Sequence, residues 1–201
     1  MLVQRLRQPS SAMTGRPRNG TNLYQDRDAG STGMLYGGRV SKEDELIDAV
    51  GDIDEAVSAL GVARASCSEP EHAEILFRVQ RDLFVVAADL AVNPAHRDRL
   101  KPRISQVLPE MVTELEAVID GLVAARPLRP VFLIPGSTPT EAAIDLSRTV
   151  VRRAERHTVR AAAVGHSVSD VVRHYLNRLS DLLYVLARHS AGPETEPASH
   201  D

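Results

Sequence analysis

The chain has few of the residues on which several classes of protein depend. It contains no tryptophan and only 3% aromatic residues, and its single cysteine, Cys67, excludes an internal disulfide and a cysteine-rich zinc site. No apolar run approaches the roughly 20 residues that a membrane-spanning helix needs. The N-terminus also lacks the apolar stretch of a signal peptide, so we expect a cytoplasmic protein with no membrane partner.

The chain also lacks a large excess of charge of one sign. Its formal net charge is -3, whereas nucleic-acid-binding domains are normally strongly basic, so we expect no nucleic-acid partner. What the 201 residues do supply is 43% hydrophobic residues, enough to fill the core of one domain. Because Ala, Val, Leu and Ile dominate over aromatics, this core favours helices.

The composition changes near both ends of the chain. Residues 1–22 mix Arg, Pro, Ser, Gly and Asn without periodicity, and residues 191–201 are polar and rich in proline. We expect these two segments to be flexible tails around one folded domain over residues 23–190. The N-terminal tail is basic, and the sequence leaves open whether it docks on a partner.

Apolar residues recur at three- and four-residue steps in five segments of this domain. In the first segment, Leu46, Val50 and Ile53 share one face. The fourth opens on a capping box, because Thr138 is followed three residues later by Glu141. Five amphipathic helices predict an all-α fold, a five-helix antiparallel bundle, and no alternating pattern is long enough to predict a sheet. The predicted helices cover about 42–65, 71–92, 101–125, 138–159 and 169–189.

The segment before the first helix, residues 23–40, is rich in glycine. Glycines permit positive φ angles and close approach of the backbone, so this segment is able to wrap an anion. It lacks the Gly-Lys-Ser/Thr ending and the preceding strand of a phosphate-binding P-loop. Such a segment is therefore more often a flexible lead-in than a nucleotide loop.

Charged residues interrupt the apolar faces of the predicted helices. Asp54 lies at the edge of the apolar stripe of the first helix, where an unpaired carboxylate is costly to bury. On the fourth helix, Arg148, Arg152 and Glu155 share one face.

On the fifth helix, Asn177 and Asp181 are one turn apart, and Arg178 is placed to pair with Asp181. Two explanations fit all these charged positions. They form ordinary salt bridges between helices, or several guanidinium groups converge on a polyanion such as a chain of phosphates. Periodicity alone does not choose between these explanations.

Two stretches of the chain resemble the signature of the PduO-type cobalamin adenosyltransferases. They are residues 147–156 (SRTVVRRAER) and residues 175–181 (YLNRLSD). Weaker resemblances occur in the same order at residues 39–44 with 51–55, 81–84 with 88–91, and 132–136. The similarity covers about residues 23–190.

The resemblance implies a helical bundle that assembles as a homotrimer, with an active site at each subunit interface. Enzymes of this family transfer the 5′-deoxyadenosyl group of ATP to cob(I)alamin, giving adenosylcobalamin (the coenzyme form of vitamin B12) and triphosphate. The resemblance also implies Mg²⁺ with the nucleotide, and an adenosylcobalamin-dependent acceptor enzyme as a further partner.

Matching motif positions implies roles for individual residues. Arg148 and Arg152 contact the ATP phosphates or hold the interface, and Asp54 pairs across it with Arg148. Phe132 faces the corrin and helps to exclude the lower axial base, and these four residues form the implied catalytic set. Asp181 supports the site on the cobalamin side. The remaining implied ATP contacts are Asp28, Gly30, Thr32, Lys42, Glu155, Asn177 and Arg178.

The implied chemistry suits these residue types. Cob(I)alamin is a powerful nucleophile, so the protein needs no general base. It must place cobalt in line with the 5′ carbon and stabilise the charge on the departing triphosphate, a task for cations. An apolar wedge such as Phe132 can shelter a four-coordinate cobalamin from water, although plain core packing also explains a phenylalanine.

The chain departs from the family pattern in the nucleotide loop, which usually reads Thr-Lys-Thr-Gly-Asp-x-Gly-x-Thr. Asp28, Gly30 and Thr32 match, but Gln25 replaces the lysine and Arg27 the first glycine. Two hypotheses therefore stand beside each other: an active adenosyltransferase, and a diverged paralogue that binds corrinoid or nucleotide as a carrier, chaperone or sensor. A helical bundle of unrelated function is a third.

The histidines show no spacing typical of metal ligands, so the sequence predicts no fixed metal centre in the protein. We expect surface or interface positions for His157, His166, His174 and His189.

Overall fold

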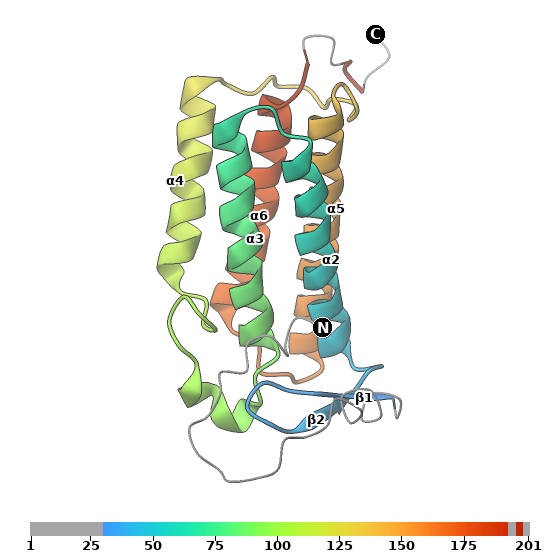
Figure 1. Ribbon diagram of the computed structural model, residues 1–201, viewed down its shortest axis with the longest axis vertical. Helices are drawn as coiled ribbons and strands as arrows, with labels where there is room; N and C mark the ends of the chain where they lie inside the picture. The colour runs from blue at the N-terminus through green and yellow to red at the C-terminus, as the bar shows by residue number, and fades with distance from the viewer. Residues whose placement is uncertain (1–29, 193–195, 199–201) are drawn as a thin grey trace.

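The computed structural model describes residues 30–192 and 196–198, and the predicted N-terminal tail and Asp28 lie outside them. Among the described residues, five α-helices run side by side along the long axis of the molecule (Figure 1). Successive helices alternate in direction, which agrees with the predicted all-α bundle. The helices are α2 (Glu45–Ala65), α3 (Pro70–Leu90), α4 (Pro109–Ala125), α5 (Pro139–Ala163) and α6 (Asp170–His189).

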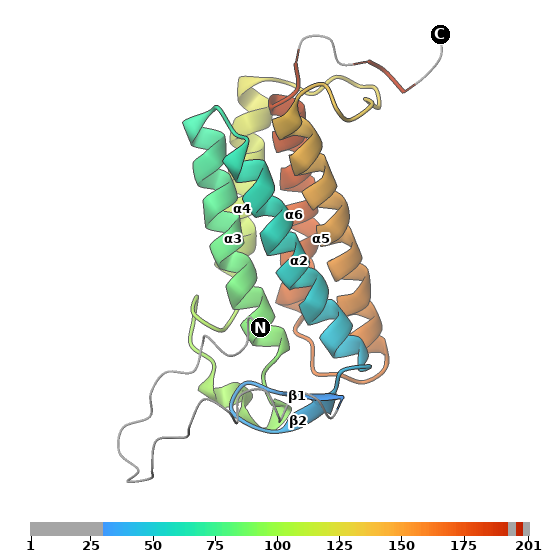
Figure 2. The same ribbon diagram turned by 45° about the vertical axis from the view of Figure 1, so that its right-hand side comes forward.

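The bundle is organised around α6. Its residues Tyr175, Leu176, Leu179 and Leu183 are fully buried among the other helices. α2 and α5 pack against each other along their length, and the view in Figure 2 shows α5 beside both α2 and α6. Burial of aliphatic side chains is the main favourable term here, at about 25 cal/mol per Å² of apolar surface.

Side-chain caps fix where three helices begin. Asp44 accepts a hydrogen bond from the backbone N–H of Leu46, and Ser169 caps α6 in a similar way. At α5, Thr138 accepts from the N–H of Glu141, as the predicted capping box requires. These contacts satisfy backbone donors that have no partner in the first turn of a helix.

The prediction for the third helix was wrong at its start. α4 begins at Pro109 rather than near residue 101. Residues 101–108 turn instead: Arg103 has a positive φ of 58°, and Ile104 is exposed. Proline lacks an N–H and favours the first helical position, so Pro109 opens the helix.

A small β-sheet covers one end of the bundle and was not predicted. β1 (Ser31–Gly33) and β2 (Arg39–Ser41) pair antiparallel, with Thr32 opposite Val40. The loop between them docks through the backbone of Leu35, whose N–H donates to Ala91 and whose carbonyl accepts from Asn93. Strands of three residues are too short to show an alternating pattern.

The 3₁₀-helix η2 (Pro94–Arg99) follows α3 at this same end. At the opposite end, the segment before α5 contacts residues near the C-terminus. The N–H of Ala198 donates to the Phe132 carbonyl, and the N–H of Ile134 donates to Glu196. The flexibility of the two tails stays a prediction. Within the described residues, no helix has the length and apolar character needed to span a bilayer.

Candidate functional site

The glycine-rich segment ends in the hairpin at the N-terminal end of α2. Gly30 has a positive φ of 65°, and its carbonyl accepts a hydrogen bond of 2.8 Å from the N–H of Lys42. Thr32 lies in β1, between these two residues along the chain. The structure thus places Gly30, Thr32 and Lys42 close together in one hairpin, and their binding of a common ligand stays a prediction.

A second group of predicted residues lines an open hollow between α5 and α6. Arg152, Glu155, Arg156, Val159 and Asn177 surround it. The amide of Asn177 donates to Glu155 Oε1 at 3.0 Å, and the guanidinium of Arg156 donates to the carbonyl of Arg152 at 3.1 Å. Within the part of the chain that the structure describes, no ion pair engages Arg152. Its charge is therefore available to an anion.

Arg148 lies on the same helix but in a different environment. Its Nε donates to Asp145 Oδ1 at 3.0 Å, and both side chains are largely shielded from solvent. Asp145 in turn lies 3.5 Å from the guanidinium of Arg188, which also binds the buried carboxylate of Glu141. Arg148 therefore belongs to an internally neutralised network, although it shares a helix face with Arg152.

Asp54 is half-buried on α2, and among the described residues no cation pairs with it. Two carboxylates of α2 do reach α5: Asp52 binds Arg153 Nε at 3.0 Å and His157 Nδ1 at 2.7 Å, and Glu55 also binds Arg153. Carboxylates of the first helix thus find partners on the fourth predicted helix, but the residues are Asp52 and Glu55. The predicted pairing of Asp54 with Arg148 across an interface stays a prediction.

Arg178 and Asp181 form the predicted ion pair, at 2.8 Å, but on another side of α6. Arg178 Nε also binds Glu116 of α4 at 3.0 Å. Consecutive residues of a helix point about 100° apart, so Asn177 faces α5 while Arg178 faces α4. One chain does not bring Arg178 into the hollow that Asn177 lines.

Phe132 is 82% exposed in the connection between α4 and α5. This connection and the hairpin lie at opposite ends of the bundle (Figure 1). α5, with 25 residues, measures about 37 Å, so Phe132 and Lys42 of one chain are far apart. A single copy of the chain does not collect all the predicted site residues around one point.

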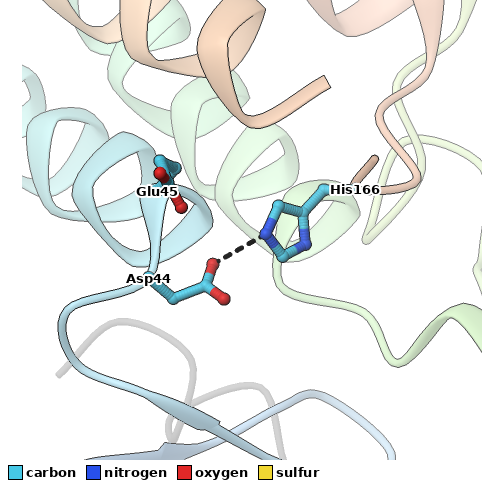
Figure 3. Close-up of side chains that lie close together, drawn as sticks. All are labelled: Asp44, Glu45 and His166. Atoms are coloured by element: carbon cyan, nitrogen blue, oxygen red, sulfur yellow. Dashed lines mark ion pairs between the residues drawn. The ribbon is translucent and has the colours of Figure 1, made fainter. Parts of the chain in front are cut away.

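Two groups of polar residues were not predicted from the sequence. Asp82 of α3 accepts a hydrogen bond of 3.0 Å from the buried hydroxyl of Tyr175, and burial raises the pKa of this carboxyl above its ordinary value. Asp44, Glu45 and His166 lie close enough together to hold a metal ion (Figure 3). Neither group shows a spacing signal, because Tyr175 is far from Asp82 in the sequence and His166 is far from the adjacent Asp44 and Glu45.

Comparisons with known proteins agree on one family. The family model described as cobalamin adenosyltransferase matches residues 24–190. A corrinoid adenosyltransferase of Citrobacter freundii is 38% identical over 164 residues, which are 80% of this chain and 89% of that protein. One of Mycobacterium tuberculosis is 39% identical over 173 residues, which are 84% of this chain and 88% of the relative.

A solved structure is similar along most of its length. It is a variant PduO-type ATP:corrinoid adenosyltransferase from Lactobacillus reuteri complexed with cobalamin and ATP. Its TM-score is 0.73 at 27% sequence identity, with 84% of this chain and 92% of that chain covered.

Proposed function

The chain belongs to the cobalamin adenosyltransferase family, and we propose that it transfers the 5′-deoxyadenosyl group of ATP to cob(I)alamin. The products are adenosylcobalamin and triphosphate. The observation that carries this proposal is the hollow in which Arg152, Glu155 and Asn177 meet within the matched region. Similarity to the relatives suggests the class of reaction. In the hollow, Arg152 offers the positive charge that a departing triphosphate needs.

The reaction balances without a proton transfer. The electron pair on cobalt(I) forms a bond to the 5′ carbon of ATP, and the bond from that carbon to its oxygen breaks. The triphosphate leaves with the electron pair of the broken bond. The protein therefore has to align the two substrates and stabilise negative charge on the leaving group.

Arg152 and Lys42 are the cations that we assign to the triphosphate. Both are exposed, and Arg152 lies in the hollow without a competing ion pair among the described residues. Glu155, fixed by Asn177, offers a hydrogen-bond acceptor to the nucleoside part. Gly30 and Thr32 lie in the hairpin beside Lys42, and Asp28 stays a predicted ATP contact.

Magnesium fits this arrangement as a companion of ATP. An ion bound to phosphates keeps several waters and needs only one or two oxygen ligands from the protein. The hydroxyl of Thr32 beside the Gly30 turn suits that role. When bound, Mg²⁺ neutralises charge on the triphosphate, which the chain's own Arg152 does as well.

A homotrimer would explain why one chain does not collect the whole site. One exposed stripe of α5 carries Leu146, Thr149, Arg152, Arg156 and Val159. Leu146 is 61% exposed and Val159 46%, and large exposed apolar side chains on one helix face mark contact surfaces. We propose that this stripe packs on a neighbouring copy, with the hollow in the shared cleft.

The remaining predicted residues take their roles through that neighbour. Phe132, already exposed, would cover the lower face of the corrin, and Asp181 would support the site on the cobalamin side. Arg178 would contact ATP from the α4 side. Asp54 would join Asp145 on the guanidinium of Arg148. We further propose that the protein acts in the cytoplasm and delivers adenosylcobalamin to an enzyme that depends on it.

An adenosylation assay tests the activity. The full chain is mixed with ATP, Mg²⁺ and cobalamin under strong, oxygen-free reduction, and the spectrum of adenosylcobalamin is followed with the nucleotide varied. We expect ATP-dependent product. If the corrinoid binds but no product forms, the chain is a carrier, chaperone or sensor, and the enzyme proposal fails.

Co-expression of two variants tests whether the site is shared. Arg152→Ala and Phe132→Ala are each expected to be weakly active alone. If the two residues meet across an interface, mixed assemblies contain some intact sites and recover part of the activity. The trimer would be contradicted if activity recovered while sedimentation showed no assembly, or if a monomeric form of the chain were active.

A further inference from the structure

Three side chains of types that serve as metal ligands in proteins lie close together beside the hairpin, at one end of the bundle. Asp44 and Glu45 stand at the start of α2, and His166 lies in the turn between α5 and α6 (Figure 3). One ligand atom of each lies within 4.8 Å of the others. Two carboxylates and an imidazole form a ligand set that zinc and similar divalent transition metals accept.

The distance between Asp44 and His166 fits a shared ion. Asp44 Oδ1 and His166 Nε2 are 2.9 Å apart. Two ligands of a tetrahedral zinc ion that each lie about 2.1 Å from the metal are roughly 3.4 Å from each other. A small side-chain rotation therefore lets both atoms reach one ion without movement of the backbone, and Glu45 also needs only a rotation of its flexible side chain.

The backbone on both sides of the cluster is fixed. Asp44 is the N-cap of α2, with the N–H of Leu46 2.8 Å from its Oδ1. In the opposite turn Gly165 has a φ of 102°, and the N–H of His166 donates to Ala161 at 3.0 Å. Ligands on rigid elements lose little freedom when an ion binds.

The charges around the cluster are unbalanced. Within the described residues, no lysine or arginine forms an ion pair with Asp44 or Glu45, and His166 is the single basic partner of Asp44. All three side chains are half-buried, so water screens them only in part. A divalent cation would neutralise the two carboxylates.

We propose that Asp44, Glu45 and His166 bind one divalent transition-metal ion, such as zinc, that ties the turn between α5 and α6 to the start of α2. This site is distinct from the Mg²⁺ that accompanies ATP, because an imidazole ligand favours zinc over magnesium. The proposal goes beyond the adenosyltransferase function and does not depend on it. Water completes the coordination, since the protein supplies three ligands.

Zinc chloride alone is the probe, with the full chain stripped of metal by a chelator and without nucleotide or corrinoid. Calorimetric titration of the wild type should show one zinc ion bound at this site. His166→Ala and Glu45→Gln should each weaken that binding at least about tenfold, since even indirect support of a ligand has effects of that size.

Matched controls carry the same residue types outside the cluster. His174→Ala removes an exposed histidine of α6, and Asp48→Asn removes an exposed acid one turn into α2. Both should bind zinc as the wild type does. If His166→Ala does not fold, Glu45→Gln, which keeps the side-chain length, carries the test.

Thermal unfolding gives a second readout. An ion that binds only the folded state raises the melting temperature with its concentration, so zinc should raise it in the wild type and in both controls. In His166→Ala the same rise should need at least about tenfold more zinc. If the wild type binds no zinc, or His166→Ala binds it equally well, the contact is an ion pair only and the proposal is wrong.

Discussion

The two halves of α5 carry similar charged residues in different surroundings. In the N-terminal half, the carboxylate of Glu141 is 0% exposed and binds the guanidinium of Arg188, which α6 supplies. In the C-terminal half, Arg152 and Arg156 stand exposed beside a hollow, with Glu155 held by an amide rather than by a cation. The N-terminal half neutralises its charges internally, whereas the C-terminal half presents Arg152 and Arg156 and pairs Arg153 and His157 with carboxylates of α2.

Glu141 shows how complete the internal pairing is. Its Oε2 accepts from the backbone N–H groups of Gly136 and Ser137, and its Oε1 faces Arg188. A charge buried in this way stabilises the fold only while every partner is present. The comparison teaches that pairing, rather than residue type, separates structural arginines from those available to a ligand.

The largest effect should come from breaking the buried network. Arg188→Met leaves Glu141 buried without its cation, which should lower the free energy of unfolding by about 3–5 kcal/mol. Denaturant unfolding measures this. Arg173→Met on the same helix removes only an exposed pair with Asp170 and should change it by less than about 1 kcal/mol. Equal losses in the two variants would contradict the comparison.

Removing the exposed charge should affect activity instead. Arg152→Ala should lower kcat/KM of adenosylation at least about 100-fold, because a cation at the leaving triphosphate is lost. The free energy of unfolding should change by no more than about 0.5 kcal/mol, as for other surface positions. Arg160→Ala, an exposed cation in the last turn of α5, is the control. Normal turnover in Arg152→Ala would show that the hollow is not the triphosphate site.

A milder change tests the amide that holds Glu155. Asn177→Asp replaces a hydrogen-bond donor by a like charge, so the Glu155 carboxylate should turn away from its position. We expect kcat/KM to fall roughly tenfold, the value of one hydrogen bond to a charged group. Asn177→Gln, which keeps the amide, should recover part of the loss. An Asp variant as active as the wild type would remove Asn177 from the site.

The smallest effect should be a loss of folding stability as the pH falls. Burial lowers the pKa of His72 and of His189, near the buried network, below the ordinary value of 6.5. The unfolded chain therefore binds more protons than the folded one below pH 6.5, and stability is lost as the pH falls through the folded pKa values. Melting temperatures between pH 7.5 and 5.5 should fall more steeply for the wild type than for a His72→Gln, His189→Gln double variant. Parallel curves would contradict this.

The periodicity of apolar residues was enough to find the helices. The predictions for α2, α3, α5 and α6 fall within a few residues of the observed bounds, because each helix buries one continuous stripe. For α4, Ile104 and Leu108 happen to match the helical phase of the residues that follow. Pro109 was the better indicator of where α4 begins. The strands of the hairpin are too short to show an alternating sequence pattern.

The site was predicted less completely, for a geometric reason. Asp52 and Asp54 flank the buried Ile53 on opposite sides, so sequence alone does not decide which of them faces α5. The link between Glu155 and Asn177 came from the family motif, since the two residues lie on different helices. His166 and Asp44 meet only through the packing of the whole bundle.

The backbone hydrogen bonds of Leu35 influence how easily the hairpin opens away from the bundle. Leu35 is the one residue of that loop whose backbone joins the end of α3 on both sides, through Ala91 and Asn93. Rupture of these two bonds, together with those from Asn93 Nδ2 to the Gly37 carbonyl and from the Tyr36 hydroxyl to the Arg99 carbonyl, would release the hairpin while α2 to α6 stay closed. Amide hydrogen exchange in the hairpin should then be fast and uniform compared with α6, and bound ATP should slow it.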